Sequence, residues 1–273
     1  QEKADVQWRV RFDAFRHAQA DWLDDYCLFA ALNAQHGGRS WIEWPQTLRD
    51  REASALSEAK SRLDDQLQRI AFEQFVFFTQ WHEIRDYAQR HDVRLFGDLP
   101  LFVAHHSADV WAHRDLFHVD AHGQAELVAG VPPDYFAEDG QIWGNPLYRW
   151  SNHEREGYAW WVRRMRTQWS LFDIVRIDHF RGLSAYWELK AGSQTARGGR
   201  WVPAPGDALL TQLHRSLYPL NLVAEDLGEI TPCWTIRFER RSRHPVAKVW
   251  SAITDPERVA GWMRFPARIE LRV

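Results

Sequence analysis

Three short apolar runs, each preceded by sequence of helical period, constrain the fold of this chain most. The runs are VRLFGDLPLFV (93–103), FDIVRID (172–178) and NLVAEDLG (221–228). Helical spacing of apolar residues covers the stretches 12–35, 52–91, 151–169 and about 207–217. Runs of this length and composition predict buried strands. Strands that alternate with helices indicate parallel βαβ units, so we expect an α/β fold.

Each predicted strand ends in an acid, at Asp98, Asp178 and Glu225. In a (β/α)8 barrel the carboxyl ends of the strands form the active face. Three carboxylates placed there would converge on one pocket. The alternative, that acids after strands only cap the following helix or pair with arginine, stays open at this point.

The residues around two of these acids suggest different protonation states. Arg176 shares a strand face with Asp178, and we expect it to hold that carboxyl ionised, as a nucleophile requires. Glu225 follows the apolar residues LVA, with Asp226 facing the other way, a setting that favours a protonated general acid. One ionised and one protonated carboxyl serve glycosidic-bond chemistry, in which a separation of roughly 5 to 5.5 Å implies retention.

Composition limits the class of ligand and the cellular compartment that we expect. The chain has 16 tryptophans, and 14% of its residues are aromatic. Such rings suit a sugar ligand, and the alternative is that they simply fill the core. The net charge of -3 gives no reason to expect nucleic acid. Cys27 and Cys233 are too far apart in sequence for a disulfide framework, and no apolar stretch predicts a signal peptide or a membrane span. We expect a cytoplasmic protein, and the start at Gln1 suggests a fragment.

Four segments resemble one known family. They are FGDLPLFVAHHSADVWA, VAGVPPDYFAEDGQIWGNPLYRW, FDIVRIDHFRGLSAYWEL and LVAEDLGEITP. Together they resemble the 4-α-glucanotransferases of the amylomaltase (disproportionating enzyme) family, from about residue 12 to residue 232. The resemblance implies a (β/α)8 barrel with inserted subdomains that acts on α-1,4-glucans by double displacement. It implies a maltooligosaccharide or α-1,4-glucan as donor and acceptor, and no cofactor.

The resemblance also implies roles for single residues. Asp178 would be the nucleophile that forms a glucosyl ester, and Glu225 would be the acid/base. Arg176 and His179 would flank the nucleophile, and Asp109 would line the donor subsites.

Three further positions complete the expected substrate-binding set. Asp98 would join it from the first strand end. Tyr135 lies in GVPPDYF, which resembles a loop that arches over the family's cleft and excludes water. Trp143 in GQIWGNPLY is the candidate sugar-stacking ring. A plain surface turn is the alternative for these two segments.

The histidines depart from the family pattern. Where the family usually has His-Asp-Ser, this chain has His105, His106 and Ser107. Five histidines fall close together in sequence, at positions 105, 106, 113, 118 and 122. Neither their spacing nor the family supports a metal site, so we expect no metal.

The end of the chain departs from the family from about Cys233. TIRFERRSR predicts an edge strand, and HPVAKVWSAIT and TDPERVAGWM predict two helices. This order resembles the start of a START-like helix-grip domain, and a divergent barrel segment is the alternative. The expected domains are a helical insert at 1–92, a partial catalytic (β/α)8 barrel at 93–232 and a short α+β segment at 233–273.

Three functions are compatible with this pattern. The first is a 4-α-glucanotransferase that transfers little or nothing as this chain is written, because a further acid of the family, which binds the distorted donor sugar, is not found here. The second is a non-catalytic remnant that at most binds α-glucans. The third is an α-glucan hydrolase on the same scaffold.

Overall fold

The computed structural model describes residues 2–135 and 137–225. These residues belong to the first of two units into which the chain divides, Gln1–Gly228. The predicted orientation of Asp226 and the START-like segment from 233 lie outside the described residues.

The described chain contains helices and strands in alternation. The α-helices are α1 (Glu2–Ala18), α2 (Ala20–Gln35), α3 (Gln46–Arg49), α4 (Ala53–Arg62), α5 (Asp64–Arg90), α6 (Ala108–Ala112), α7 (Trp150–Arg155), α8 (Ala159–Leu171) and α9 (Gly206–Leu217). The strands are β1 (Phe96–Leu99), β2 (Leu127–Val131), β3 (Gln141–Pro146), β4 (Ile174–Ile177), β5 (Ala185–Lys190), β6 (Arg200–Pro203) and β7 (Leu222–Ala224).

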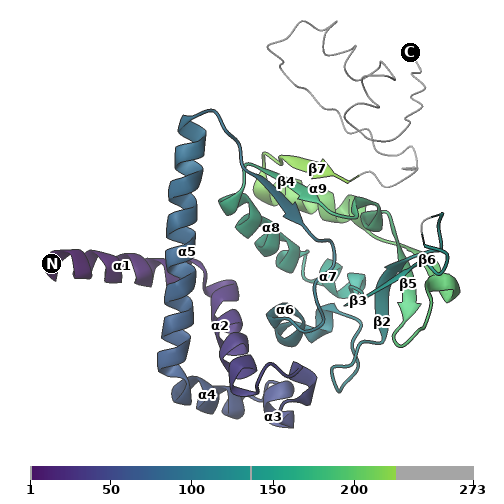
Figure 1. The fold of residues 1–273 in the computed structure, drawn as a ribbon, viewed down its shortest axis with the longest axis horizontal. Coiled ribbons are helices and arrows are strands. Elements are labelled where there is room, and N and C mark those ends of the chain that lie inside the picture. The colour runs from purple at the N-terminus through teal and green to yellow at the C-terminus, as the bar shows by residue number, and fades with distance from the viewer. Residues whose placement is uncertain (1, 136, 226–273) are drawn as a thin grey trace, which may run out of the picture. The chain divides into compact units, whose positions relative to one another are not determined.

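The predicted parallel strands are confirmed. β1, β4 and β7 form a three-stranded sheet in that order, and both neighbouring pairs are parallel. A helix precedes each strand along the chain, namely α5, α8 and α9. α8 packs on β1 and β4, with α9 beside it (Figure 1). Because β4 is central, a side chain at its carboxyl end has neighbours from both other strands.

Two of the predicted helices are each divided in two. The stretch 12–35 divides between α1 and α2 at Gln19, and 52–91 divides between α4 and α5 at Leu63. Neither position is glycine or proline, so local sequence gives no signal for the break. Tertiary packing sets it instead, since α2 and α5 bury a common apolar cluster that contains Leu23 and Ile70.

The third predicted helix, 151–169, is interrupted by a left-handed turn. Gly157 and Tyr158 have φ values of 62° and 56°, and they separate α7 from α8. Tyr158 is buried, so packing of its side chain accompanies this uncommon backbone conformation.

A second sheet was not predicted. β2, β3, β5 and β6 form an antiparallel sheet in the order β3-β2-β5-β6, in segments that the sequence assigned to loops. β3 contains glycine, asparagine and proline, and its pairing with β2 shifts register between Val128 and Gly130, so no clean alternation marks it. Gly130 is required there, because a Cβ atom would lie 2.3 Å from the carbonyl oxygen of Gln141.

The main core is rich in tryptophan. Trp41, Trp111 and Trp161 are fully buried. Two of these rings have hydrogen-bonded nitrogens: Trp41 Nε1 donates to the carbonyl of His105 at 2.8 Å, and Trp111 Nε1 donates to that of Leu48 at 3.1 Å. These three tryptophans therefore fill the core, which was the alternative to a sugar-binding role.

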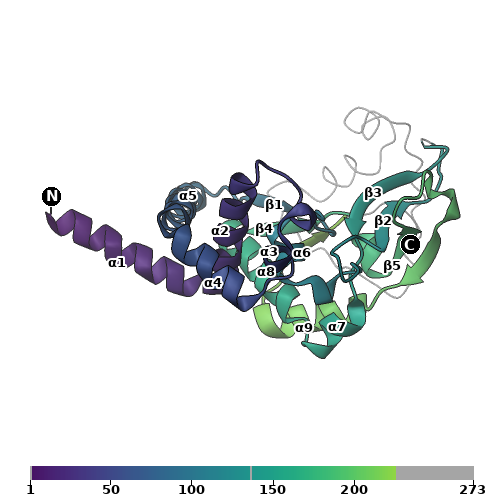
Figure 2. The ribbon, with the colours of Figure 1, turned by 90° about the horizontal axis from the view of Figure 1, so that it is seen from below.

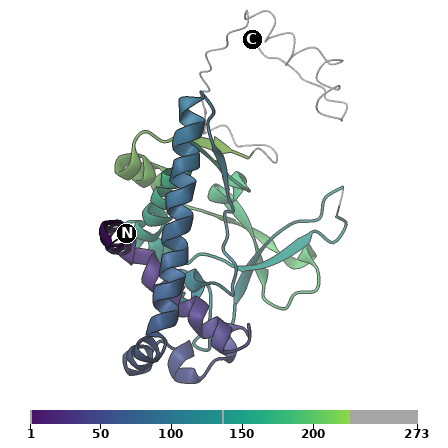
Figure 3. The same ribbon diagram turned by 60° about the vertical axis from the view of Figure 1, so that its left-hand side comes forward.

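The two sheets and the first helices occupy separate regions. Helices α1 to α5 gather on one side of the parallel sheet, and the antiparallel sheet lies on the other (Figure 2). The long helix α5 leads directly into β1 (Figure 3). Its Arg85 side chain donates two hydrogen bonds to one carboxylate oxygen of Asp173, at 3.1 and 2.9 Å, and the other oxygen accepts from Leu95 N at 2.8 Å. This contact joins α5 to the beginnings of β1 and β4.

Candidate active site

One guanidinium contacts three carboxylates at the carboxyl ends of β1, β4 and β7. Arg176 Nε and Nη2 lie 2.8 and 3.1 Å from the two carboxylate oxygens of Asp98. Arg176 Nη2 also donates to Asp178 Oδ1 at 2.7 Å, and Nη1 donates to Glu225 Oε1 at 3.2 Å. The structure thus brings together the three acids that the sequence placed at strand ends. We call these four residues the acid cluster.

Sheet register explains the cluster. Asp98 lies directly opposite Arg176 in the β1–β4 pair, and Arg176 lies opposite Val223 in the β4–β7 pair. Residues two apart on a strand share a face, so Asp178 and Glu225 point to the same side as Arg176.

Backbone contacts also fix Glu225. Its Oε2 accepts a hydrogen bond from the backbone nitrogen of His179 at 2.6 Å. Its own backbone nitrogen donates to the carbonyl of Ile177 at 3.3 Å. Glu225 is therefore held between the guanidinium of Arg176 and the turn that follows β4.

His179 has an uncommon backbone conformation, with φ of 51° and ψ of 44°. Its side chain is buried, and neither ring nitrogen has a hydrogen-bond partner among the described residues. Gly182 leaves room for the ring, since a Cβ atom there would lie 2.9 Å from His179 Cδ2 and 2.4 Å from Leu101 Cδ2. Strained backbone and an unpartnered polar ring are typical of functional sites.

The antiparallel sheet contributes an aromatic ring to the same place. Trp143 in β3 is 37% exposed, and its ring centroid lies 4.8 Å from that of His179 at an interplanar angle of 86°. Phe102 lies behind it, with ring centroids 6.3 Å apart. The sequence named Trp143, but not Phe102 or Gly182. The motif HFRG, with a glycine three residues after the histidine, was a usable signal for Gly182.

The expected effect of Arg176 on Asp178 is present, but the net direction of the pKa of this carboxyl is upward. Burial raises the pKa of Asp178, and so does the neighbouring Glu225 carboxyl. Arg176 lowers this pKa, but it does not outweigh those two causes. Burial is the largest cause, and the single guanidinium that opposes it is shared among three carboxyls.

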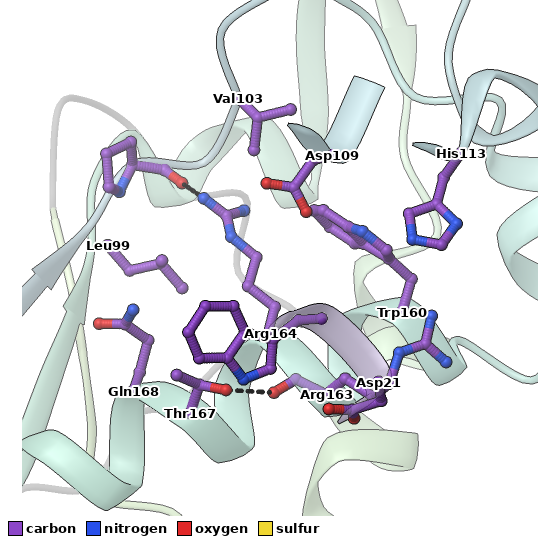
Figure 4. A pocket seen from close by; sticks show the side chains of 12 residues that line it. Asp21, Leu99, Val103, Asp109, His113, Trp160, Arg163, Arg164, Thr167 and Gln168 are labelled. Carbon is purple, nitrogen blue, oxygen red and sulfur yellow. Dashed lines mark hydrogen bonds between the residues drawn. The ribbon is translucent and has the colours of Figure 1, made fainter. Parts of the chain in front are cut away.

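Two predicted site residues lie elsewhere. Tyr135 is 96% exposed in the connection between β2 and β3. Asp109 in α6 lines a cavity with Leu99, and none of the acid-cluster residues lines that cavity (Figure 4). The roles expected for Tyr135 and Asp109 stay predictions.

The histidines that follow β1 have local partners. His105 Nε2 lies 2.7 Å from the carbonyl oxygen of Gly123, and His106 Nε2 lies 3.1 Å from Asn33 Oδ1. In the part of the chain that the structure describes, no three histidine, cysteine or acidic side chains form a group suited to a metal ion.

Solved structures show the same fold. The amylomaltase from Streptococcus agalactiae, in complex with acarbose, has a TM-score of 0.78 and 34% sequence identity, over 85% of this chain and 46% of its own. The amylomaltase from Corynebacterium glutamicum has a TM-score of 0.66 over 83% of this chain and 30% of its own, and its 19% identity shows the fold alone. The chain therefore has a mixed α/β fold of the (β/α)8 class, of which the described strands form a part.

Sequence comparison gives the family. A model of the 4-alpha-glucanotransferase family matches residues 1–255. The 4-alpha-glucanotransferase of Thermus thermophilus is 52% identical over 231 residues, which are 85% of this chain and 46% of that protein. That of Synechocystis sp. is 46% identical over 223 residues, 81% of this chain and 44% of that protein. This chain belongs to the 4-alpha-glucanotransferase family.

Three further findings bear on the sequence predictions. The chain spans about half the length of the relatives it matches. The family match includes residues 233–255, so the comparisons do not support a START-like domain there. Within the described ranges, no helix combines the length and apolar character needed to cross a membrane.

Proposed function

We propose that this chain carries the acid chemistry of a 4-α-glucanotransferase, which moves α-1,4-glucan segments between maltooligosaccharides with retention. The observation that supports this proposal most is that Asp178 and Glu225 both contact the guanidinium of Arg176 at the carboxyl ends of parallel strands. Family membership and a structural neighbour solved with acarbose support a saccharide as ligand.

In the first half of the reaction, the Asp178 carboxylate attacks C1 of the donor sugar and forms a glucosyl ester. The Glu225 carboxylic acid gives its proton to the departing glycosidic oxygen. In the second half, the Glu225 carboxylate takes the proton of an acceptor 4-hydroxyl. That oxygen displaces Asp178 from C1 and restores the α linkage.

Other residues at and beside the acid cluster would bind the sugar. The unpartnered ring nitrogens of His179 suit a sugar hydroxyl, and the exposed face of Trp143 suits the C–H side of a pyranose. Asp98 and Arg176 would contact further hydroxyls. Tyr135 would help to exclude water. A donor-side role for Asp109 stays a prediction from sequence, because Asp109 lines a cavity that no acid-cluster residue lines. A START-like tail and a cytoplasmic location stay predictions from sequence.

The test is product distribution from maltotriose. Because the chain spans about half of its relatives, we use a composite enzyme, in which the matching residues of this chain replace the matched region of the Thermus thermophilus relative. Transfer predicts glucose together with maltodextrins longer than maltotriose. Hydrolysis to glucose and maltose alone would contradict the proposal, and binding without any turnover would favour a non-catalytic remnant.

A further inference from the structure

A cavity of about 360 Å³ lies on the opposite face of β1 from the acid cluster. Alternate residues of a strand face opposite ways. Asp98 contacts Arg176, whereas the buried Leu99 lines this cavity. Its other walls come from α2, α6 and α8 (Figure 4). The volume falls within the range of roughly 300 to 1,000 Å³ that small-molecule sites have.

Helix α8 presents one face to the cavity. Arg163 and Arg164 follow Trp160 by three and four residues, Thr167 follows them by four and three, and all four line the cavity. Arg164 is already engaged, because its Nη2 donates to the carbonyl of Pro100 at 2.6 Å and its Nη1 to that of another loop residue at 3.1 Å. Arg164 is therefore part of the wall rather than a free donor.

Three charged side chains in the cavity are unpaired. Asp21 from α2, Asp109 from α6 and Arg163 from α8 make no side-chain hydrogen bond or ion pair with any residue that the structure describes. His113 also lines the cavity. Burial lowers the pKa of His113, and the nearby Arg163 lowers it further, so the imidazole is neutral at pH 7.

The charges of the cavity balance. The two carboxylates of Asp21 and Asp109 offset the two guanidiniums of Arg163 and Arg164. An anionic ligand would meet two unpaired carboxylates, and a cationic ligand would meet Arg163. The cavity therefore favours a neutral ligand that both donates and accepts hydrogen bonds.

The aromatic walls define the ligand further. The rings of Trp22 and Trp160 line the cavity, and Trp22 Nε1 donates to Gln19 Oε1 at 2.7 Å, which fixes its orientation. Trp160 is buried, with the Arg164 guanidinium 5.3 Å from its ring centroid, so the half-buried Trp22 is the ring that a ligand can contact. An indole beside hydrogen-bonding carboxylates matches a pyranose, which has apolar C–H faces and a rim of hydroxyls. We propose that this cavity is a saccharide-binding site for glucose or maltose, separate from the acid cluster. Only the choice of glucose and maltose rests on the proposed function.

The test is calorimetric titration of the 273-residue chain with glucose and with maltose. Asp21→Ala and Arg163→Gln should each weaken binding about tenfold, because each removes a charged hydrogen-bond partner worth at least about 1.4 kcal/mol. The matched controls are Asp24→Ala on α2 and Arg166→Gln on α8, both at exposed positions, and neither should change the affinity. Thermal melts followed by circular dichroism verify that every variant folds.

Titration of the Trp143→Ala chain separates the two sites. Maltose binding that persists in this variant and is weakened by Arg163→Gln supports the cavity site, even if no transfer activity is found, in which case only the proposed function fails. Maltose affinity that is unchanged by both Asp21→Ala and Arg163→Gln would overturn the inference. So would binding of inorganic phosphate that depends on Arg163 and is tighter than that of maltose.

Discussion

Asp178 is one of three acids that share a single cation. Asp98 takes two of the contacts of Arg176, and Glu225 takes a third. The positive charge available to Asp178 is therefore partial, while burial and the nearby Glu225 carboxyl raise its pKa. The folded chain binds the proton of this carboxyl more tightly than an exposed aspartate does.

This raised pKa predicts how stability depends on pH. Between the ordinary aspartate pKa of about 3.9 and the raised value, the folded state keeps this proton while the unfolded state has lost it. The contribution of the Asp178 carboxyl to the free energy of unfolding therefore falls as pH rises through this window. The side-chain amide in the Asp178→Asn variant does not titrate in this range. In melts of the 273-residue chain, this variant should therefore gain stability relative to wild type as pH rises through this window. A difference in melting temperature that is the same at pH 3 and pH 7 would contradict the sign.

Glu225 is expected to act by proton transfer. In the composite enzyme, Glu225→Gln should lower turnover of maltotriose roughly 10² to 10⁴-fold, the usual contribution of general acid-base catalysis. The loss should be smaller with a 4-nitrophenyl maltoside donor, whose leaving group needs no proton. Equal losses with both donors would show that Glu225 acts in some other way, for example by holding the turn at His179.

For single residues, the sequence indicated which side chains lie together in the site, but not how their charges balance. Arg176 and Asp178 share a face because they are two apart, which any strand guarantees. Asp98 is 78 residues away from Arg176 in sequence, and only sheet register shows that it takes two contacts of the same guanidinium. For that reason the sequence predicted the effect of Arg176 on Asp178, but not that the net pKa of this carboxyl is raised.

Among the elements, the junction of α5 with β1 and β4 depends on Asp173. Burial raises the pKa of Asp173, but hydrogen bonds from Leu95, Gln89 and Arg85 outweigh it and leave this pKa lowered. Asp173→Ala should therefore lower the free energy of unfolding by about 1.5 to 3 kcal/mol at pH 7, the range for hydrogen bonds to a charged group. Urea denaturation of the 273-residue chain measures this change in the free energy of unfolding.

The effect should also depend on pH. A lowered pKa gives stability that is present above the ordinary value of about 3.9 and is lost as pH falls through the folded value, so the difference should shrink in acid. The control is Glu73→Gln, whose exposed pair with Arg69, at 3.7 Å, should be worth about 0.5 kcal/mol or less. An effect of Asp173→Ala as small as the control's would show that the junction does not depend on this carboxyl.

Elements with strong periodicity were predictable, and those defined by packing were not. β4 and β7 follow from short apolar runs between helices, and they were placed correctly. The break at Leu63 has no local signal, because apolar spacing continues through it. β3 lacks regular alternation and owes its pairing to Gly130, which lets the neighbouring backbone approach.

For the whole molecule, the candidate site needs both sheets. The parallel sheet supplies the acids and Arg176, and the antiparallel sheet supplies Trp143 beside His179. Family motifs located these residues in the sequence, although the second sheet itself was not predicted. The long-range pairing β3-β2-β5-β6 explains how a segment that resembled a surface turn reaches the acid cluster.

The central claim is that Asp178 forms the covalent intermediate of glucan transfer. The most direct measurement is maltotriose disproportionation by the composite enzyme with Asp178→Asn, compared with wild type and with Asp86→Asn, an exposed position on α5. The claim predicts that Asp178→Asn forms neither glucose nor longer maltodextrins, because an amide cannot form the ester, while Asp86→Asn keeps full activity. Near wild-type turnover by Asp178→Asn would contradict it.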